Sequence, residues 1–219
     1  MNKDTYLRGI KRLGTSCAPP ACLSFYKHMR SRREFQSAKR KIKGHTRLHL
    51  ACGNHILTGW ANIDLLPHKG VISYDLTRSF PVGSATIQFI FTEHFIEHLS
   101  YEDCHRFLSE CQRVLVPGGV IRLSTPDLRK LINEYLAENL TTWTDVGFAP
   151  ATPCRMMNEG MRLWGHQFLY DVKELENILS ESGFGKITQL PWRESGYAEL
   201  MHLECRPYHG ELIIEAIKG

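Results

Sequence analysis

The chain has 219 residues, of which 42% are hydrophobic, 23% charged and 10% aromatic, the composition of an ordinary soluble globular protein. No apolar run approaches the roughly 20 residues of a membrane span, and the opening MNKDTYLRGIKRLG lacks the apolar block of a signal peptide. The seven cysteines form no C-x-x-C pair, which favours reduced thiols over a zinc site. We therefore expect a cytoplasmic protein built as one domain, or as one domain with an appendage.

The net charge of +4 conceals an uneven distribution. Residues 1–46 hold 12 Lys and Arg against 2 acids, a balance of +10, and the remainder holds 15 basic and 21 acidic residues, or −6. We interpret 1–46 as a basic, partly helical N-terminal arm and 47–219 as the main domain. A charge run is most often a solvated surface, although peripheral contact with an anionic membrane or lipid-linked substrate also fits the arm. Nucleic acid is less favoured, because no aromatic-rich RNA motif accompanies the charge.

The N-terminal region divides at about residue 25. Pro19-Pro20 disfavours helix and predicts a loop over residues 1–24. Loosely helical spacing of apolar residues predicts a helix with a narrow apolar stripe from Phe25 to Lys43.

Residues 47–64, RLHLACGNHILTGWANID, read as a strand, a turn at Cys52-Gly53 and a second strand that ends in Asp64. A strand that runs into a glycine turn exposes backbone N–H groups and lets a ligand approach the main chain. An acid at the end of the neighbouring parallel strand can hydrogen-bond a ribose diol. Because Asp64 follows Gly53 by only eleven residues, the connection must be a single turn or a loop. This argues against NAD or FAD, whose pyrophosphate needs a helix N-terminus there.

Downstream, short apolar strands alternate with amphipathic helices. Strands are predicted over residues 70–74, 87–91, 120–124, 184–192 and 211–218, and helices over 101–115, 126–136 and 172–183. Ser100 and Asp171 are predicted N-caps, and Pro117-Gly118-Gly119 is predicted to end the first of these helices. The alternation predicts an α/β fold with a doubly wound parallel sheet. Residues 141–170 interrupt it without a clear period, and their apolar content favours an ordered cap.

The segments LHLACGN, GWANIDL, ISYDLTRSFPVGSATIQFIFTEHFIEHL and FLSECQRVLVPGGVIRLSTPDL together resemble class I S-adenosylmethionine-dependent methyltransferases. Within that class they resemble the small "type 11" predicted methyltransferases often found near glycan-assembly genes. The resemblance runs from about Arg47 to Lys218 and rests on the combination of motifs. It implies S-adenosylmethionine as the cofactor and a Rossmann-like, doubly wound, seven-stranded and mostly parallel sheet with an antiparallel last strand.

The resemblance implies roles for the residues around the first turn. Ala51, Cys52 and Gly53 would form the loop under the methionine part of the cofactor, where a side chain at position 53 would obstruct the ligand. Ala51 replaces the first glycine of the usual motif, so the loop is tighter on one side. Asp64, followed by Leu65, would accept hydrogen bonds from both ribose hydroxyls.

Four further residues receive cofactor-binding roles from the same resemblance. Asp75 would accept a hydrogen bond from the adenine amino group, and Leu76 would lie against the adenine ring. Thr92 and Glu93, at the end of the fourth strand, would lie beside the methionine amino group.

The catalytic candidates follow directly in the motif. An alcohol acceptor must lose a proton, and a neutral histidine with a pKa of about 6.5 suits that task. The candidates are His94, near the transferred methyl group, and His98, with Glu97 and Glu93 as orienting groups or alternative bases. If the strand runs directly into a helix, the i, i+4 spacing places Glu93 with Glu97 and His94 with His98 on one helical face. His98 also fits a helix-capping or core histidine, and no third metal ligand is evident, so no metal site is predicted.

We therefore predict a methyltransferase that acts on an O- or N-acceptor, and family analogy favours a saccharide or small metabolite. The alternative is a methyltransferase-like cofactor-binding protein without turnover, which docks on RNA or an anionic membrane through its basic arm. A nicotinamide oxidoreductase would need a longer glycine loop. The 141–170 insertion is a candidate cap over an acceptor pocket, although its apolar side chains also fit a core. Its candidate lining residues are Met156, Met157, Met161, Trp164, His166, Phe168 and Tyr170.

Overall fold

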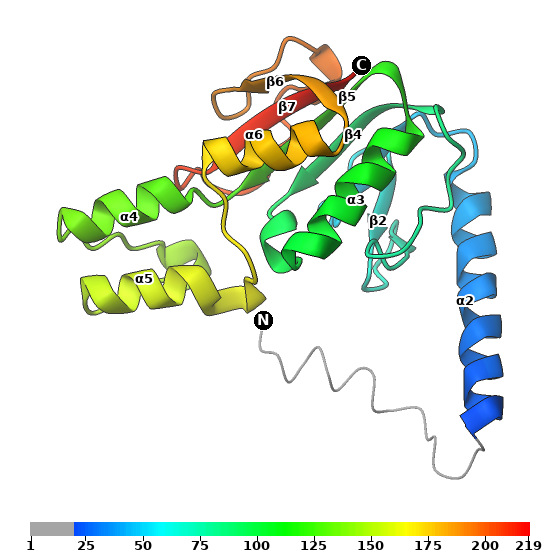
Figure 1. Ribbon diagram of the computed structural model, residues 1–219, viewed down its shortest axis with the longest axis horizontal. Helices are drawn as coiled ribbons and strands as arrows, with labels where there is room; N and C mark the ends of the chain where they lie inside the picture. Colours follow the sequence, from blue (N-terminus) through cyan, green and yellow to red (C-terminus); the bar gives the residue numbers. More distant parts are fainter. Residues whose placement is uncertain (1–19) are drawn as a thin grey trace.

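The computed structural model describes residues 20–219. They form one seven-stranded sheet, with the strand order β3-β2-β1-β4-β5-β7-β6, and the helices around it (Figure 1). The strands are β1 (Arg47–Leu50), β2 (Ala61–Asp64), β3 (Ile72–Ser73), β4 (Ile87–Glu93), β5 (Leu115–Thr125), β6 (Phe184–Gln189) and β7 (Leu212–Lys218). Neighbouring strands are parallel, except that β7 is antiparallel to both β5 and β6. The predicted Rossmann-like sheet with an antiparallel last strand is therefore confirmed.

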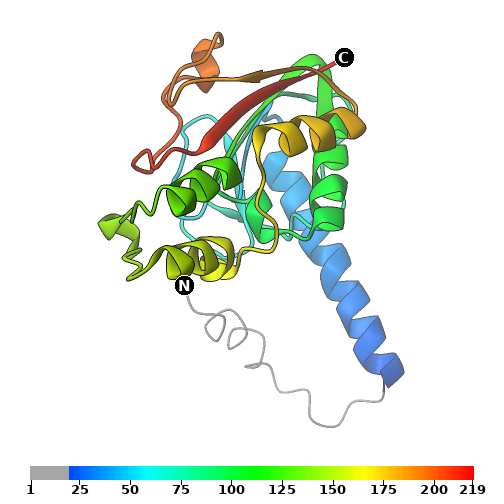
Figure 2. The same ribbon diagram turned by 60° about the vertical axis from the view of Figure 1, so that its left-hand side comes forward.

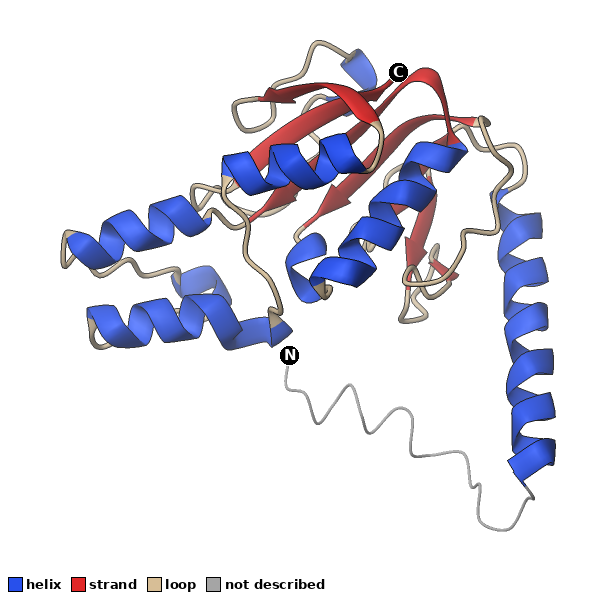
Figure 3. Ribbon diagram, in the orientation of Figure 1, coloured by secondary structure: helices blue, strands red, loops and turns tan. Residues whose placement is uncertain are grey.

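Helices flank this sheet and extend one end of it (Figures 1 and 3). They are α2 (Pro20–Ile42), α3 (Tyr101–Val114), α4 (Leu128–Leu136), α5 (Pro153–Arg162) and α6 (Val172–Glu181). Short 3-10 helices are η1 (Ile96–His98), η2 (Thr144–Val146), η3 (Leu163–Gly165) and η4 (Ala198–Leu200). Ser100 accepts the N–H of Asp103 at the start of α3, and Asp171 caps α6 in the same way, so both predicted N-caps are confirmed.

The two faces of the sheet are covered differently, because side chains alternate between the faces along each strand. Leu48, Leu50 and Ile90 belong to the main core, which includes side chains of α2, α3 and α6. Phe91 and Trp60 belong to a second cluster with Leu200 of η4 and other side chains of the connection between β6 and β7. This connection, residues 190–211, therefore covers part of the second face.

A buried ion-pair network fastens the 190–211 connection to the sheet. The guanidinium of Arg122 on β5 is fully buried and donates to Glu204 at 2.7 Å and to Glu215 at 2.9 Å. It also donates to the backbone carbonyl of Glu194 at 2.8 Å. A charge removed from water is tolerated only when it is paired in this manner, so the connection has a fixed position over the sheet.

The structure corrects three local predictions. Helix α2 begins at Pro20, so the predicted loop is wrong for residues 20–24, while residues 1–19 lie outside the described part. Proline is compatible with the first helical position, where its missing N–H needs no partner. Strand β3 has two residues instead of the predicted five.

Strand β5 begins at Leu115 instead of the predicted residue 120, and it includes the segment Pro117-Gly118-Gly119, which was predicted only to end the preceding helix. The pairing of β5 with β4 shifts register there. A Cβ atom at Gly119 would lie 2.9 Å from the carbonyl oxygen of Val116 and 3.2 Å from that of Gln88. Only glycine therefore allows this close backbone approach.

Helix α2 contacts the sheet through its C-terminal half. Ala38 and Ile42 are buried in the main core, and the ring of Phe35 meets that of Tyr74 edge-on at 6.4 Å. The N-terminal half of α2 projects beyond the sheet (Figures 1 and 2). Within residues 20–219, no helix combines the length and the apolar character needed to cross a lipid bilayer.

Candidate functional site

The strand register gathers the predicted cofactor-binding residues at one edge of the sheet. Leu50 of β1 is paired with Ile63 of β2 on one side and with Thr92 of β4 on the other. Because these strands are parallel, the segments that follow them emerge side by side. Ligands of open α/β sheets bind outside the carboxyl ends of the strands, and this edge is the corresponding place here.

Asp64 closes the turn that follows β1. Its Oδ2 accepts the backbone N–H of Gly53 at 2.9 Å, and its Oδ1 accepts that of Leu66 at 2.8 Å. Cys52 donates its N–H to the carbonyl of Ile63 at 3.1 Å. Burial, helped by the charge of Asp64, raises the pKa of the Cys52 thiol to about 12. Cys52 is thus a packed residue whose thiol stays protonated at neutral pH.

The turn also leaves room above its backbone. Ala51 and Gly53 both have left-handed conformations, with φ of 53° and 52°. A Cβ atom built on Gly53 meets no heavy atom within 4 Å, so the space next to it is open. Open space beside a glycine turn, with a carboxylate held against it, fits the predicted position of a nucleoside cofactor. No helix separates β1 from β2, which confirms the predicted single turn or loop.

The residues after β2 and β3 lie nearby but differ in exposure. Leu65 is exposed, and the N–H of Tyr74 donates to the carbonyl of Asp64 at 2.9 Å. The carboxylate of Asp75 accepts the N–H and hydroxyl of Thr77 at 3.0 and 2.7 Å, so it stabilises its own turn. Leu76 is buried in the main core. Its side chain therefore packs against the protein, whereas the resemblance implied a surface for the adenine ring.

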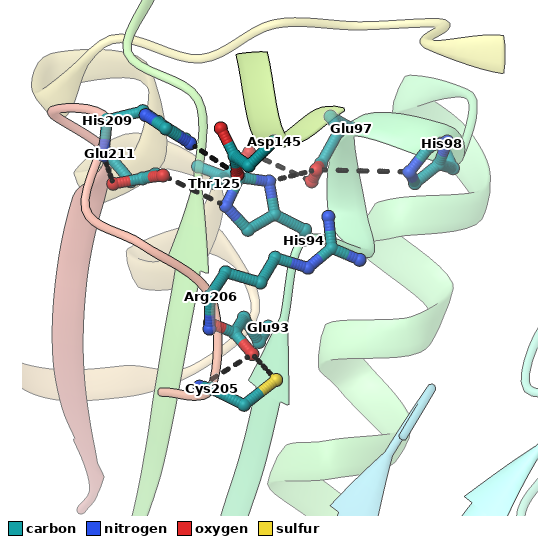
Figure 4. Close-up of polar contacts among 10 residues, drawn as sticks. All are labelled: Glu93, His94, Glu97, His98, Thr125, Asp145, Cys205, Arg206, His209 and Glu211. Carbon is teal, nitrogen blue, oxygen red and sulfur yellow. Dashed lines mark hydrogen bonds and ion pairs between the residues drawn. The ribbon is translucent and has the colours of Figure 1, made fainter. Parts of the chain in front are cut away.

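At the tip of β4 the 190–211 connection comes close to the strand (Figure 4). Thr92 is fully buried. Glu93 accepts the backbone N–H groups of Cys205 and Arg206, each at 3.3 Å, and its carboxylate lies 3.1 Å from the Cys205 thiol sulfur. Sequence reasoning did not predict this contact, because more than 100 residues of chain separate the partners.

The chain changes direction at His94. This residue has a left-handed φ of 51°, and its N–H donates to the carbonyl of Ser124 at 3.0 Å. Strand β4 therefore does not run directly into a helix, and only η1 follows. The predicted common helical faces are wrong as a result. Glu93 faces the 190–211 connection, whereas Glu97 faces His94 (Figure 4).

Glu97 is the centre of a buried polar cluster (Figure 4). Its Oε1 lies 3.2 Å from Nδ1 of His94 and 3.9 Å from Nε2 of His98. Its Oε2 accepts the hydroxyl of Thr125 at 3.0 Å. Nε2 of His94 lies 3.4 Å from Oε1 of Glu211. The imidazole of His94 is thus held between two carboxylates.

These contacts give the two histidines different charges. Burial alone would lower the pKa of His94, but the carboxylates of Glu211 and Glu97 outweigh it and raise that pKa to about 9. Burial opposes ionisation of Glu97, yet His94 and His98 lower its pKa to about 2. The pKa of His98 is lowered, chiefly by burial. At neutral pH His94 is therefore a cation, in contrast to the neutral base expected from the sequence, and His98 is neutral.

A cavity of about 150 Å³ lies against this cluster. Its walls come from three distant parts of the chain: the β4 tip with η1, the region from α4 through the 141–170 insertion, and the end of the 190–211 connection. They carry carboxylates, imidazoles, the side chains of one lysine and one arginine, and two indole rings. The polar and aromatic lining residues are His94, Glu97, His98, Asp127, Lys130, Glu134, Trp143, Asp145, Trp164, His166, Arg206, His209 and Glu211.

The 141–170 insertion contributes to the cavity, but through few of the predicted side chains. Of the seven candidates, Trp164 and His166 line it. Met156 and Tyr170 are fully buried in hydrophobic clusters, and the remaining three do not line it either. The insertion is also more regular than predicted, because Thr152 caps α5 by accepting the N–H of Arg155.

Several lining residues were missed, although their positions carried a signal. Asp127 follows the carboxyl end of β5, where the ends of parallel strands form the crevice. His209 and Glu211 precede β7, and an antiparallel strand begins at the edge where its parallel neighbours end. The correct prediction of an antiparallel last strand would therefore have been sufficient to place His209 and Glu211 at this edge.

Part of the chain matches a known protein family, and two solved structures are distant neighbours. Residues 48–123 match a family model described as a methyltransferase domain. A SAM-dependent methyltransferase from Thermotoga maritima, described as a possible histamine N-methyltransferase, is 13% identical, with 90% of this chain and 96% of that chain covered and a TM-score of 0.49. A SAM-dependent methyltransferase from Archaeoglobus fulgidus is 19% identical, with 89% and 99% covered and a TM-score of 0.49. No curated protein sequence matches the chain.

The matched segment contains the turn after β1, Asp64 and the whole of the β4 tip with η1. These are the elements that form the open carboxyl edge of the sheet. Residues 48–123 therefore belong to a methyltransferase domain, and this match together with the sheet supports an S-adenosylmethionine-dependent methyltransferase.

Proposed function

We propose that the enzyme methylates an oxygen or nitrogen atom of a small polar acceptor, a saccharide or other small metabolite, bound in the cavity beside the β4 tip. The observation that carries this proposal is the position of the cavity, which adjoins His94 at the same sheet edge as the Gly53 turn. A cavity of about 150 Å³ is large enough for a ligand the size of benzene, so one six-membered ring sets the scale of the group that enters.

The cavity walls suit a ring that carries hydroxyl or amino groups. Trp143 and Trp164 offer aromatic faces for its apolar side. Carboxylates of Asp127 and Asp145 and the guanidinium of Arg206 offer hydrogen bonds for its polar groups. An insertion that carries Trp143, Asp145 and Trp164 would act as the acceptor cap.

We assign cofactor binding to the turn of Ala51 to Gly53, to Asp64 with Leu65, and to the β4 tip. The carboxylate of Asp64 is already oriented by the Gly53 N–H, so little order is lost when it accepts ribose hydroxyls. Asp75 lies close to this group, next to Tyr74, which hydrogen-bonds Asp64. When bound, S-adenosylmethionine supplies an electrophilic methyl group on a sulfonium.

Acceptor activation is assigned to the cluster of His94, Glu97 and His98. His98 is neutral at pH 7, because burial lowers its pKa, and it borders the cavity, so its ring can take the acceptor's proton. Glu97, ionised and fixed by Thr125, holds the cationic His94 in place. Holding the acceptor in line contributes on the order of 7–11 kcal/mol in favourable cases, which makes cavity shape as important as the base.

The test is transfer of radiolabelled methyl groups from S-adenosylmethionine to a panel of nucleotide sugars, glycans, small amines and RNA. We expect turnover with a single-ring acceptor and a far smaller rate for His98→Asn, with unchanged affinity for S-adenosylhomocysteine. Methylation of RNA alone, or equal losses of turnover and affinity in His98→Asn, would contradict the proposal. A crystal soaked with S-adenosylhomocysteine would locate the cofactor relative to Asp64.

A second candidate is cofactor binding without turnover, with docking on RNA or an anionic membrane through the basic arm. It is favoured by one observation, the projecting N-terminal half of α2 (Figure 1). Ala38 and Ile42 lie in the core, so a deletion of the arm would damage the fold. Arg32→Glu with Arg33→Glu changes exposed charges only. Loss of salt-sensitive binding to RNA or anionic vesicles, in a protein that methylates none of the panel, would favour this candidate.

The location of the enzyme belongs to the same proposal. Five cysteines in the described part of the chain are free thiols, as a reducing cytoplasm would leave them. Fractionation of cells that express the tagged protein would test it, and recovery in the membrane fraction would contradict a purely cytoplasmic location.

A further inference from the structure

We propose that Glu97, His98 and His166 form a binding site for one divalent transition-metal ion on the wall of the cavity. One ligand atom from each residue lies within 4.8 Å of the other two. Two imidazoles and one carboxylate form a donor set that binds zinc and related ions. All three side chains line the cavity, so an ion held between them would face the space assigned to the acceptor.

The ligand atoms are nearly close enough for coordination. Oε1 of Glu97 lies 3.9 Å from Nε2 of His98. The ring centroids of His98 and His166 are 5.0 Å apart, with the rings at 68° to one another. Two ligand atoms about 2.1 Å from a tetrahedral zinc ion are separated by about 3.4 Å. The gap to be closed is therefore about 0.5 Å between Glu97 and His98, and the other two pairs also lie within 4.8 Å.

The surrounding contacts orient two of the three ligands. Nδ1 of His166 lies 3.0 Å from the backbone carbonyl of Gly160, so it donates there and leaves Nε2 as the electron-pair donor. Hydrogen bonds of this kind fix the tautomer and ring orientation of metal-binding histidines in known sites. Glu97 is held in a similar way by the hydroxyl of Thr125.

The site would leave coordination positions for the acceptor. Catalytic zinc sites have three protein ligands and an open position, whereas structural sites have four protein ligands. Three ligands on one wall of a cavity match the first arrangement. This inference rests on the proposed function and refines it: with an ion bound, His98 would act as a ligand, and the ion would lower the pKa of an acceptor hydroxyl so that its proton is released to solvent.

A second cluster in the described part of the chain, His55 with Glu93 and Cys205, competes for the same ion. Its carboxylate already accepts two backbone N–H groups of the 190–211 connection and contacts the Cys205 thiol. Binding there would disrupt those contacts. An ion on Oε1 of Glu97 would compete with the contact to Nδ1 of His94, but it would leave the Thr125 hydrogen bond on Oε2 intact. We favour the Glu97 cluster because its three residues line the cavity, whereas those of the second cluster do not.

The experiment is a titration of the metal-free full-length protein with Co²⁺, followed by visible absorption, and a calorimetric titration with Zn²⁺. Wild-type protein is expected to bind one equivalent. His166→Asn and His98→Asn should each weaken binding at least tenfold. His105→Asn on α3 removes a histidine that does not line this cavity and belongs to neither cluster, and it should leave binding unchanged. Thermal unfolding of each variant confirms that it is folded.

Two results would overturn the inference. One is the absence of saturable binding at millimolar Zn²⁺ in folded wild-type protein. The other is binding that His166→Asn leaves unchanged and Cys205→Ser abolishes, since this places the ion at the His55 cluster. Because the titration needs neither cofactor nor acceptor, its failure leaves the proposed methyl transfer standing. Conversely, a protein that binds the ion but methylates nothing would contradict the proposed methyl transfer and leave the metal site standing.

Discussion

The two ends of the sheet's carboxyl edge are built in opposite ways. Near β1 and β2, a short backbone turn and one carboxylate carry the proposed cofactor contacts, and Gly53 and Asp64 are close in the sequence. Near β4 and β5, the cavity draws charged and aromatic side chains from three distant segments. The first end is formed by residues that are close in the sequence. The second end forms only when distant segments come together in the complete fold.

This difference implies that the two ends fail separately. Changes to the cavity should alter the acceptor or the rate and spare cofactor affinity, and changes to the turn should do the reverse. Distant sites that share no partners behave additively, so variants from the two ends should combine without interaction.

The largest expected effect comes from the cavity end. Glu97→Gln removes the charge that holds His94 and should lower kcat by roughly 10²- to 10³-fold, a typical range for loss of acid–base function. Affinity for S-adenosylhomocysteine, measured by calorimetry, should change little. An equal loss of affinity would show that the two ends are coupled. Breaking a buried ion pair also costs stability, so the variant must be compared at a temperature where it is folded.

The next effect concerns the support beneath the turn. His49 on β1 is buried and lies 3.1 Å from Oδ1 of Asn62, whose amide also holds the loop at Leu57. Burial lowers the pKa of His49 to about 4. Between pH 6.5 and 4 the unfolded chain binds a proton at His49 that the folded chain does not bind, so stability falls as pH falls.

The loss amounts to about 3 kcal/mol at most, at 1.36 kcal/mol per unit of pKa difference. Urea unfolding of wild type and His49→Leu between pH 7 and 4.5 measures it as the difference between the two proteins. As the pH falls, the free energy of unfolding of wild type should decrease relative to that of His49→Leu. Parallel curves would mean that the pKa of His49 is the same in the folded and unfolded states.

Asp64→Asn tests the turn itself. Loss of charge-assisted hydrogen bonds to a ribose diol should weaken S-adenosylhomocysteine binding by about 10- to 100-fold, at roughly 1.5–3 kcal/mol per bond to a charged group. Turnover at saturating cofactor should stay near the wild-type value. Asp75→Asn should have the smaller effect, because that carboxylate already holds Thr77. Unchanged affinity in Asp64→Asn would remove Asp64 from the site.

Ala51→Gly should have the smallest effect, and an unusual sign. A left-handed residue other than glycine costs about 1–2 kcal/mol, and the added freedom of glycine in the unfolded chain returns part of that. We expect a net gain in stability of up to about 1 kcal/mol. Ala137→Gly is the matched control, because Ala137 has an ordinary φ of −83° and should lose stability. A loss in both variants would contradict the strained-turn interpretation.

The same contrast explains what sequence could predict. The existence of the strands and of the capped helices depends on short-range patterns, and these were predicted correctly apart from the lengths of β3 and β5. The cavity depends on contacts such as Glu93 with Arg206, which no local pattern records. The charge of His94 was also beyond reach, because it depends on Glu211 from a distant segment. Burial of Leu76 and Met156 was missed because apolar side chains fit a core and a pocket equally well.

The 190–211 connection has a consequence for how this enzyme can diversify. Arg122 fastens it to the sheet, Leu200 fills the second apolar cluster, and Arg206 reaches the cavity. This segment both packs against the sheet and lines the cavity. Replacing it as a whole would therefore disrupt the buried contacts of the core. New acceptor preferences should therefore be engineered by exchanging parts of the 141–170 insertion, which lies farther from the buried contacts of Arg122 and Leu200.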